Sequence, residues 1–258
     1  MNQENIAIRL EGITSVSALI RALREGTARR RILSLLIEES KKRTEFRRVA
    51  FLRSAAEELG FPLRFVSAEE LNTLATGHTH GGILAQVTEA VFPGADDLHP
   101  TGQGFSVLLE GAEDPYSLGH SMRALYSAGA RELILPFRFP AGADAVLARA
   151  SAGCSELLPV YICDPCEAAK KYAAAGYELA AAGIRNAEVL PVAHLRFPLL
   201  LIVGGEKRGI SAGLAAMAET QLKIPYERDF MGSLPTETAV SVFAYELMRR
   251  QQYGQSES

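Results

Sequence analysis

Short apolar runs alternate with amphipathic segments along nearly the whole chain, and this alternation restricts the fold more than any other feature of the sequence. An apolar run of a few residues indicates a buried strand, whereas apolar residues that recur every three or four positions indicate a helix. Strands separated by helices of this length form βαβ units, in which a parallel sheet carries helices on its faces. The sequence therefore predicts an α/β fold.

The alternation is interrupted at residues 92–104, "FPGADDLHPTGQG", which are rich in Pro, Gly and Asp and lack periodicity. Such a segment is typical of a linker. The strands expected before it form a small parallel or mixed sheet and occupy residues 30–40, 62–67 and 80–87. The strands expected after it occupy residues 105–111, 132–136, 158–163, 187–191, 198–205 and 221–225. We therefore predict two α/β domains, a small one at residues 1–95 and a doubly wound one at residues 104–254.

The composition excludes several classes of protein. The chain of 258 residues is 48% hydrophobic and 22% charged, as in soluble globular proteins. It has no apolar run of about 18 residues and no N-terminal secretory signal, so we expect a cytoplasmic protein without a membrane span. The three cysteines cannot all pair, and the nearest candidate histidine, His194, is far along the chain. We therefore expect reduced thiols and no metal site.

Positive charge is concentrated in the first part of the chain. Residues 1–64 contain 13 Lys and Arg against 8 Asp and Glu, although the formal net charge of the whole chain is -3. The basic residues gather at residues 29–31, 41–43 and 47–48. This pattern predicts either a surface that binds a polyanion or an ordinary solvated helix surface.

Ligands of open α/β sheets bind beyond the carboxyl ends of the strands, and one of these ends is rich in glycine. The loop after residues 199–203 contains Gly204, Gly205 and Gly209, which let a backbone approach a ligand closely, with Glu206 between them. Neither the phosphate-binding loop pattern nor G-x-G-x-x-G is present. A glycine loop with an acid suits a ligand that carries hydroxyl groups and a positive charge. A simple tight turn between a strand and a helix is the alternative.

Three such loops follow one another in a fixed order. They contain D-P-x-x-x-G-x-x-x-R at residues 114–123, V-G-G-E-x-x-G-I-S at 203–211, and an I-P pair at 224–225 followed by S-L-x-x-x-x-A at 233–239. This order resembles the three motifs of the SpoU (TrmH-like) RNA 2′-O-ribose methyltransferases of the SPOUT superfamily. In addition, "GHTHGGILAQV" at residues 77–87 is similar to the H-Q-G-V-x-A segment that closes the L30e-like RNA-binding domain of that family.

The resemblance implies a small N-terminal L30e-like domain and a C-terminal Rossmann-like domain that is threaded into a trefoil knot. It also implies a homodimer, which packs the first-motif helix and the final helix across a two-fold axis, so that each site borrows from both subunits. The knot loops of the family hold S-adenosylmethionine. By position, the cofactor contacts are Val203, Gly204, Gly205, Glu206, Gly209, Ile224, Pro225, Ser233 and Leu234.

The resemblance further implies that Arg123 lies near the methyl donor and engages the target ribose or its phosphate. The alternative is an arginine on the helix surface or in a salt bridge of the dimer. Because a guanidinium group normally stays protonated, we expect it to position the substrate and stabilise charge rather than to act as a base. Three positions depart from the family pattern: Ser117 and Pro235 replace asparagines, and Glu237 replaces a serine. We count Ser117 and Glu237 as candidate catalytic residues. A role for Glu237 in stabilising the start of the final helix is the alternative.

We assign RNA contacts to Arg29, Arg30 and Arg31 from the charge pattern and to His78 and His80 from the family-like segment. A hydrogen bond that stabilises their loop is the alternative for the two histidines. The resemblance implies an enzyme that methylates a ribose 2′-hydroxyl of rRNA or tRNA in RNA processing. Two other hypotheses stay open: a non-catalytic RNA-binding or cofactor-sensing relative, and an unrelated doubly wound enzyme that binds a nucleotide.

Overall fold

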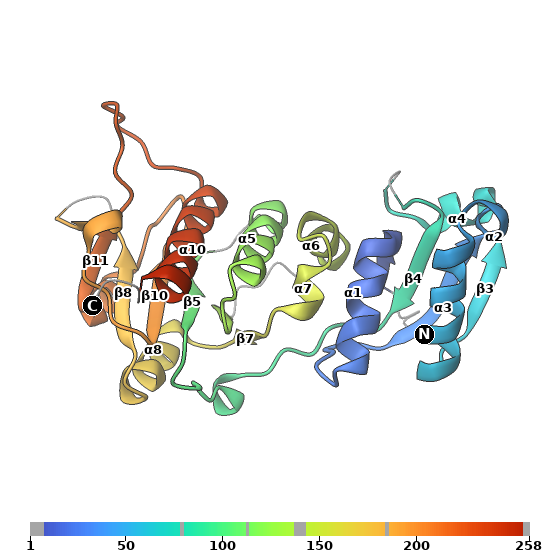
Figure 1. The fold of residues 1–258 in the computed structure, drawn as a ribbon, viewed down its shortest axis with the longest axis horizontal. Helices are drawn as coiled ribbons and strands as arrows, with labels where there is room; N and C mark the ends of the chain where they lie inside the picture. Colours follow the sequence, from blue (N-terminus) through green and yellow to red (C-terminus); the bar gives the residue numbers. More distant parts are fainter. Residues whose placement is uncertain (1–7, 78–79, 112–113, 137–142, 184–185, 255–258) are drawn as a thin grey trace, which may run out of the picture. The chain divides into compact units, whose positions relative to one another are not determined.

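The computed structural model of the chain describes residues 8–77, 80–111, 114–136, 143–183 and 186–254. The chain forms two compact units (Figure 1). Unit 1 comprises Met1–Val91 and Ala141–Leu157, and unit 2 comprises Phe92–Pro140 and Leu158–Ser258. The first boundary falls at the start of the expected linker. Unit 1 also includes a segment from the second half of the chain, which the sequence did not indicate.

The sheet of unit 1 is mixed and has four strands in the order β1-β4-β2-β3. The strands are β1 (Ile8–Glu11), β2 (Ile32–Glu38), β3 (Leu63–Val66) and β4 (Ile83–Val87). Strand β2 is parallel to β3 and antiparallel to β4, and β4 is antiparallel to β1. Strand β1 was not predicted, because its four residues run directly into helix α1 (Gly12–Arg24) without a turn.

Helices cover both faces of this sheet. The helices are α1, α2 (Lys41–Thr44), α3 (Phe46–Leu59) and α4 (Ala68–Leu74). Leu35 and Ile37 of β2 pack in one core with α1 and α3, whereas Leu36 packs in a second cluster with Leu71 of α4. Successive residues of a strand point to opposite faces, so β2 is buried on both sides and is apolar throughout its centre.

Two local sequence signals mark helix ends in unit 1. Helix α3 ends at Gly60, whose φ of 71° is in the left-handed region that favours glycine. Helix α4 begins after Ser67, whose side chain accepts a hydrogen bond from the backbone N–H of Glu70.

The segment from the second half of the chain contributes helices α6 (Asp144–Ala150) and α7 (Cys154–Leu157) to unit 1. Ala148 belongs to the same core as α1 and accepts a hydrogen bond from the Ser15 hydroxyl at 3.3 Å. Gly153 has a φ of 81°, and a Cβ atom there would lie 2.6 Å from the Cβ atom of Ala18. The close approach of the segment to α1 therefore requires glycine at this position.

The sheet of unit 2 has seven strands in the order β7-β6-β5-β10-β8-β11-β9, and every pairing is parallel. The strands are β5 (Phe105–Leu109), β6 (Leu133–Leu135), β7 (Val160–Ile162), β8 (Glu178–Ala182), β9 (Glu188–Val189), β10 (Leu199–Val203) and β11 (Thr220–Lys223). The prediction of an α/β fold with a mostly parallel sheet is confirmed. Strand β8 was not predicted, because the alanine-rich sequence "ELAAA" lacks the β-branched residues that indicate a strand.

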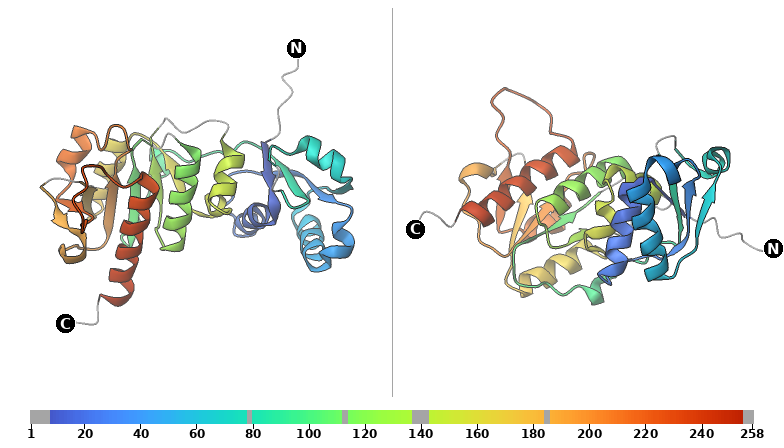
Figure 2. Two further views of the ribbon diagram at one scale, coloured as in Figure 1. Left: turned by 90° about the horizontal axis from the view of Figure 1, so that it is seen from above. Right: turned by 45° about the vertical axis from the view of Figure 1, so that its right-hand side comes forward.

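Helices of unit 2 also lie on both faces. They are α5 (Pro115–Ser127), α8 (Pro165–Ala174), α9 (Ala212–Met217) and α10 (Thr236–Tyr253), with short 3-10 turns η1 (Ala95–Asp97) and η2 (Leu190–Val192). Helices α8 and α9 share a core with Leu200 and Ile202 of β10. Helices α5 and α10 lie side by side, as two views show (Figures 1 and 2).

Candidate functional site

A cavity of about 610 Å³ lies at the carboxyl ends of β8, β10 and β11 in unit 2. All nine residues predicted to contact a cofactor line it, namely Val203, Gly204, Gly205, Glu206, Gly209, Ile224, Pro225, Ser233 and Leu234. Its further lining residues are Ala182, Gly183, Val189, Ile210, Lys223, Tyr226, Phe230, Thr236, Ala239 and Phe243. Because parallel strands end at the same edge of a sheet, the fold gathers loops that are far apart in the sequence.

The glycine loop after β10 forms one wall of the cavity with its backbone. The backbone N–H of Gly209 donates to the carbonyl oxygen of Gly205 at 2.9 Å, which closes the loop into a tight turn. A Cβ atom at Gly204 would lie 2.2 Å from the carbonyl carbon of Gly209. No side chain fits there, so glycine is needed to bring the two backbone segments together.

The loops after β5 and β10 contact each other directly. A Cβ atom at Gly205 would lie 2.7 Å from the carbonyl oxygen of Gly111. The carboxylate of Glu110 accepts a hydrogen bond from the backbone N–H of Ser211 at 2.7 Å, at the start of α9. The first and second motif loops are thus held in one arrangement.

The third motif loop is tied to the second and to itself. The backbone N–H of Thr236 donates to the Glu206 carboxylate at 3.3 Å, and that of Leu234 donates to the Tyr226 hydroxyl at 3.2 Å. The ring centroids of Tyr226 and Phe230 are 5.8 Å apart. These two aromatic residues were not predicted, although aromatic side chains in a long loop between a strand and a helix were a signal that could have indicated them.

Helix α5 presents Arg123 to solvent. Leu118, Met122 and Leu125 are buried, whereas Arg123 is exposed and has no hydrogen bond or ion pair with any residue that the structure describes. The charge therefore lies on the face of α5 that the unit does not use for packing.

Asp114 and Pro115 form the start of α5. Asp114 accepts a hydrogen bond from the backbone N–H of Ser117 at 2.7 Å, and Pro115 is the first helical residue. The backbone N–H of Ser117, followed by its hydroxyl group, holds the pKa of the Asp114 carboxyl below its usual range. Ser117 is half-buried and fixes this cap.

Glu237 lies in the first turn of α10, where a negative charge is favourable. Its Oε2 atom is buried and has no hydrogen-bond partner among the described residues. Arg123, Ser117 and Glu237 are not among the residues that line the cavity. They belong instead to the neighbouring helices α5 and α10.

Two arginines of the first basic cluster are wholly or partly buried in unit 1. The Arg30 side chain is 4% exposed and pairs with Asp144 at 2.5 Å and with Glu156 at 3.2 Å. Arg29 donates to the backbone carbonyl of Ser155. Burial lowers the pKa of Arg29, and the negative charge of Glu156 acts against this shift. Burial raises the pKa of Glu156, and the positive charges of Arg30 and Arg29 act against that shift.

This placement contradicts the expectation for Arg30, because a guanidinium group committed to a buried network cannot reach a phosphate, whereas Arg29 is only partly buried. Arg31 is exposed. His80 is buried, accepts a hydrogen bond from the backbone N–H of Gly82 and bonds Asn72 through its other ring nitrogen at 2.8 Å. For His80 the loop-stabilising alternative is therefore the observed one. His78 lies outside the described residues.

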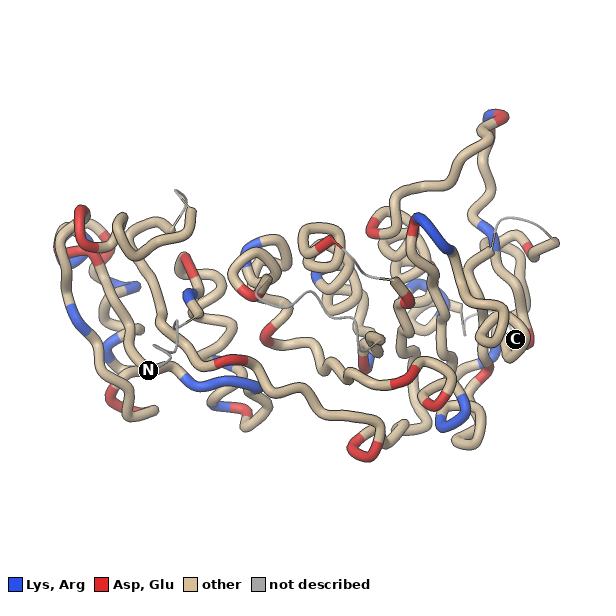
Figure 3. Tube along the Cα trace, turned by 180° about the vertical axis from the view of Figure 1, so that it is seen from behind, with Lys and Arg blue, Asp and Glu red and all other residues tan. Residues whose placement is uncertain are grey.

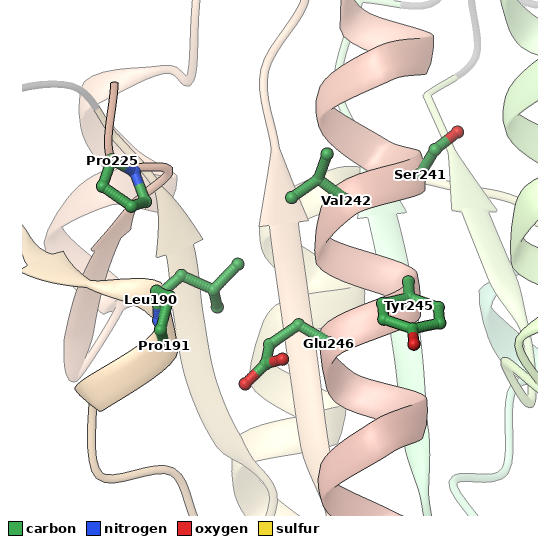
Figure 4. Close-up of a pocket in the computed structure, with 7 residues that line it drawn as sticks. All are labelled: Leu190, Pro191, Pro225, Ser241, Val242, Tyr245 and Glu246. Atoms are coloured by element: carbon green, nitrogen blue, oxygen red, sulfur yellow. The ribbon is translucent and has the colours of Figure 1, made fainter. Parts of the chain in front are cut away.

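A second cavity of unit 2 is an apolar groove of about 340 Å³ beside α10 (Figure 4). Its lining residues are Leu190, Pro191, Pro225, Ser241, Val242, Tyr245 and Glu246. Tyr245 is 62% exposed on the outer side of α10. Large apolar side chains are thus left uncovered on this helix.

The parts of the chain that the structure describes contain no cluster of His, Cys, Asp and Glu able to hold a metal ion. Cys163 and Cys166 form no disulfide within the described part of the chain. No described helix is long and apolar enough to cross a membrane.

Comparisons with known proteins cover both units. A model of the SpoU rRNA Methylase family matches residues 104–245, and a model for RNA 2′-O ribose methyltransferase substrate binding matches residues 9–93. The chain is similar to two proteins named 23S rRNA (guanosine-2′-O-)-methyltransferase RlmB. The protein of Shewanella oneidensis is 26% identical over 245 residues, which cover 93% of this chain and 96% of that protein. The protein of a Burkholderia species is 29% identical over 231 residues, which cover 87% and 93%.

The fold is also similar to solved structures. A crystal structure of an AdoMet-bound rRNA methyltransferase from Sinorhizobium meliloti matches with a TM-score of 0.77 and 21% identity, over 97% of this chain and 89% of that chain. At this identity the likeness establishes the fold of the chain.

Proposed function

The chain belongs to the SpoU rRNA Methylase family, and on this premise we propose that it is an S-adenosylmethionine-dependent RNA ribose 2′-O-methyltransferase. It transfers a methyl group to a ribose 2′-hydroxyl of rRNA or tRNA. The observation that carries the proposal is the single cavity at the strand ends. Residues from the second and third motifs line it together, and Gly111, beside the first motif, touches its glycine wall.

The cavity suits S-adenosylmethionine in size and in chemistry. Its volume of about 610 Å³ lies within the range of small-molecule sites, roughly 300–1,000 Å³. The backbone of Gly204 and Gly205 lines it where a side chain would clash. Glu206 supplies a carboxylate that Thr236 holds in place, and a carboxylate favours a ligand that carries positive charge. We assign the nine predicted cofactor contacts to this cavity.

When bound, S-adenosylmethionine supplies a methyl group on a positively charged sulfonium, which the ribose 2′-oxygen attacks in line. The protein must orient that hydroxyl and favour its deprotonation. Arg123 has five N–H donors and no partner among the described residues, so it can bind the ribose or its phosphate and stabilise the developing negative oxygen.

Glu237 is the candidate acceptor for the hydroxyl proton. Its buried Oε2 atom has no hydrogen-bond partner among the described residues, and an unsatisfied buried carboxylate oxygen is costly unless a ligand supplies a donor. Ser117 holds the cap of α5 together with Asp114 and so positions the helix that carries Arg123. Its role is to position rather than to touch the substrate.

We further propose a homodimer that packs α5 and α10 against their copies. Three features support it: the apolar groove of Figure 4, the exposed Tyr245, and the position of Arg123 outside its own cavity. In such a dimer Arg123 completes the site of the other copy. We also propose the trefoil knot, and the path of the chain supports it. After β11, which lies next to β8, the chain passes the cavity again and continues into α10, which packs on α5.

We assign residues 1–95 to an L30e-like RNA-substrate-binding domain and residues 104–254 to a SPOUT methyltransferase domain. The model for RNA 2′-O ribose methyltransferase substrate binding, which matches residues 9–93, supports the first assignment. Helices α6 and α7 lie within residues 104–254 but belong to compact unit 1, so part of the sequence assigned to the second domain packs with the first. We also infer a cytoplasmic enzyme, because rRNA and tRNA are found there.

Calorimetric titration with S-adenosylhomocysteine tests the cofactor site without knowledge of the RNA. We expect micromolar binding, on the order of -8 kcal/mol, that Gly205→Arg abolishes. Gly94→Arg is the matched control, because a Cβ atom at Gly94 has its nearest neighbour at 4.0 Å. Failure of the wild-type protein to bind at high concentration would favour the non-catalytic alternative. Methyl transfer to rRNA from tritiated S-adenosylmethionine, lost in Arg123→Ala, then tests the reaction.

A further inference from the structure

Helices α2 and α3 of unit 1 carry a dense positive charge that remains on the surface. Between Lys41 and Arg53 the sequence contains six basic residues and a single acidic residue, Glu45. Lys41 and Arg48 both donate hydrogen bonds to the Glu45 carboxylate, at 2.7 and 2.5 Å. The hydrogen bond from Lys41, followed by that from Arg48, lowers the pKa of Glu45. The acid is therefore neutralised within the stretch, and Figure 3 shows where the basic and acidic positions lie along the trace.

Two of the remaining arginines have no partner in the described structure. Arg43 and Arg47 are exposed, and neither has a hydrogen bond or an ion pair with a described residue. They flank Phe46 in the sequence, one on each side. This leaves two positive groups, four positions apart in the sequence, available to a polyanion.

Phe46 lies between these arginines and is 72% exposed. Its ring has no cation or aromatic partner among the described residues. The neighbouring rings differ, because Lys42 and Arg53 lie over Phe65, at 4.0 and 5.0 Å from its centroid, and Arg24 lies over Phe51 at 5.5 Å. Of these three rings, Phe46 is the one that no described cation covers.

The same end of the sheet carries the loop that resembles the family's RNA-binding segment. A Cβ atom at Gly82, which has a φ of 77°, would lie 2.5 Å from Cε of Lys41. Strand β4 begins at this loop and runs antiparallel to β2, whose end leads into α2. The basic helices and the loop at residues 80–82 are therefore neighbours.

We propose that the surface formed by Lys42, Arg43, Phe46, Arg47 and Arg53, here called the α3 face, binds an unpaired segment of the RNA substrate. Arg43 and Arg47 contact phosphates, and an unstacked base lies on the ring of Phe46. Unpaired RNA fits this face better than a duplex does, because the bases of a duplex are stacked on each other and leave no face for Phe46. The proposal deepens the proposed function, on which it rests, by naming where the substrate docks.

Fluorescence anisotropy with a labelled, unstructured RNA of about 16 nucleotides tests the α3 face directly. The same strand annealed to its complement is the second probe. We expect the wild-type protein to prefer the single strand and Phe46→Ala to weaken its binding roughly 10-fold. Leu33→Ala is the matched control, because Leu33 is 46% exposed at the opposite end of β2, and we expect it to leave the affinity unchanged.

The experiments distinguish a failure of this inference from a failure of the proposed function. Titration with S-adenosylhomocysteine reports the cofactor site independently, and we expect Phe46→Ala to bind it like the wild type. Equal RNA affinity of Phe46→Ala and the wild type overturns the inference and assigns the face to another kind of partner. A wild-type protein that binds neither probe, or binds the duplex equally well, also overturns it, even if the cofactor binds.

Discussion

Two basic stretches of unit 1 look alike in the sequence and have opposite surroundings in the structure. Arg29 and Arg30 lie under α6 and α7, where Asp144 and Glu156 neutralise Arg30. Arg43 and Arg47 lie on the surface beside an exposed phenylalanine. Net charge along a chain therefore does not identify a polyanion-binding site. What distinguishes the stretches is whether acids from a distant part of the chain are brought over them.

The largest expected effect is the loss of the buried arginine. Arg30→Met leaves the carboxylates of Asp144 and Glu156 buried without their partner, so we expect the free energy of unfolding to fall by about 3–5 kcal/mol. Urea denaturation followed by circular dichroism measures it. Arg47→Met is the control, since a substitution at an exposed site should change stability by no more than about 0.5 kcal/mol. Equal stability of the two variants would contradict the contrast between the stretches.

The next effect concerns the segment that covers the arginines. Gly153→Ala places a Cβ atom 2.6 Å from that of Ala18, at a φ of 81°, so we expect a loss of about 2–3 kcal/mol from overlap and backbone strain. Gly129→Ala has a similar φ of 79° with nothing within 4 Å, and it should cost only the strain, about 1 kcal/mol.

Hydrogen exchange locates the consequence of that change. In Gly153→Ala we expect faster exchange over residues 144–157 and increased reaction of Arg29 and Arg30 with an arginine reagent. If exchange in this segment stayed as slow as in the wild type, contacts other than the packing of Gly153 against α1 would hold residues 144–157 in place.

A smaller effect is expected in the salt dependence of RNA binding. Removal of two phosphate contacts by the double change Arg43→Ala, Arg47→Ala should lower the slope of log affinity against log salt by about 1.4 for a single strand. The double change Arg21→Ala, Arg24→Ala is the control, because these arginines already pair with Glu25 and Glu58. A control that lowered the slope as much would show that the charge of unit 1 acts without a defined face.

The smallest expected effect is that two glutamates change the free energy of unfolding in opposite directions as the pH rises. Burial raises the pKa of Glu156, so its contribution to stability is present below its ordinary value near 4.5 and is lost as the pH rises through the raised pKa. Hydrogen bonds lower the pKa of Glu45, so its contribution is present above 4.5 and is lost as the pH falls. Unfolding free energies of Glu156→Gln and Glu45→Gln, compared with the wild type across this pH range, should therefore differ with opposite slopes. Slopes of the same sign would mean that the two carboxylates share one kind of environment.

Much of the fold could be predicted from local signals in the sequence, and the lining of the cavity at the strand ends from the resemblance of three motifs to a known family. Apolar runs and helical periods gave the α/β class, and Gly60 and Ser67 marked helix ends where the structure has them. The three motif loops follow parallel strands, and parallel strands bring their carboxyl ends together. That is why nine predicted residues line one cavity.

Only the tertiary structure decided which elements and side chains lie inside. The alanine-rich β8 is a central strand because β10 and β11 pair with it on both sides, which no local propensity shows. The burial of Arg30 depends on Asp144, which is 114 positions away in the sequence. A local pattern records what a residue can do, whereas its surroundings depend on contacts between distant segments, and these form only when the chain folds.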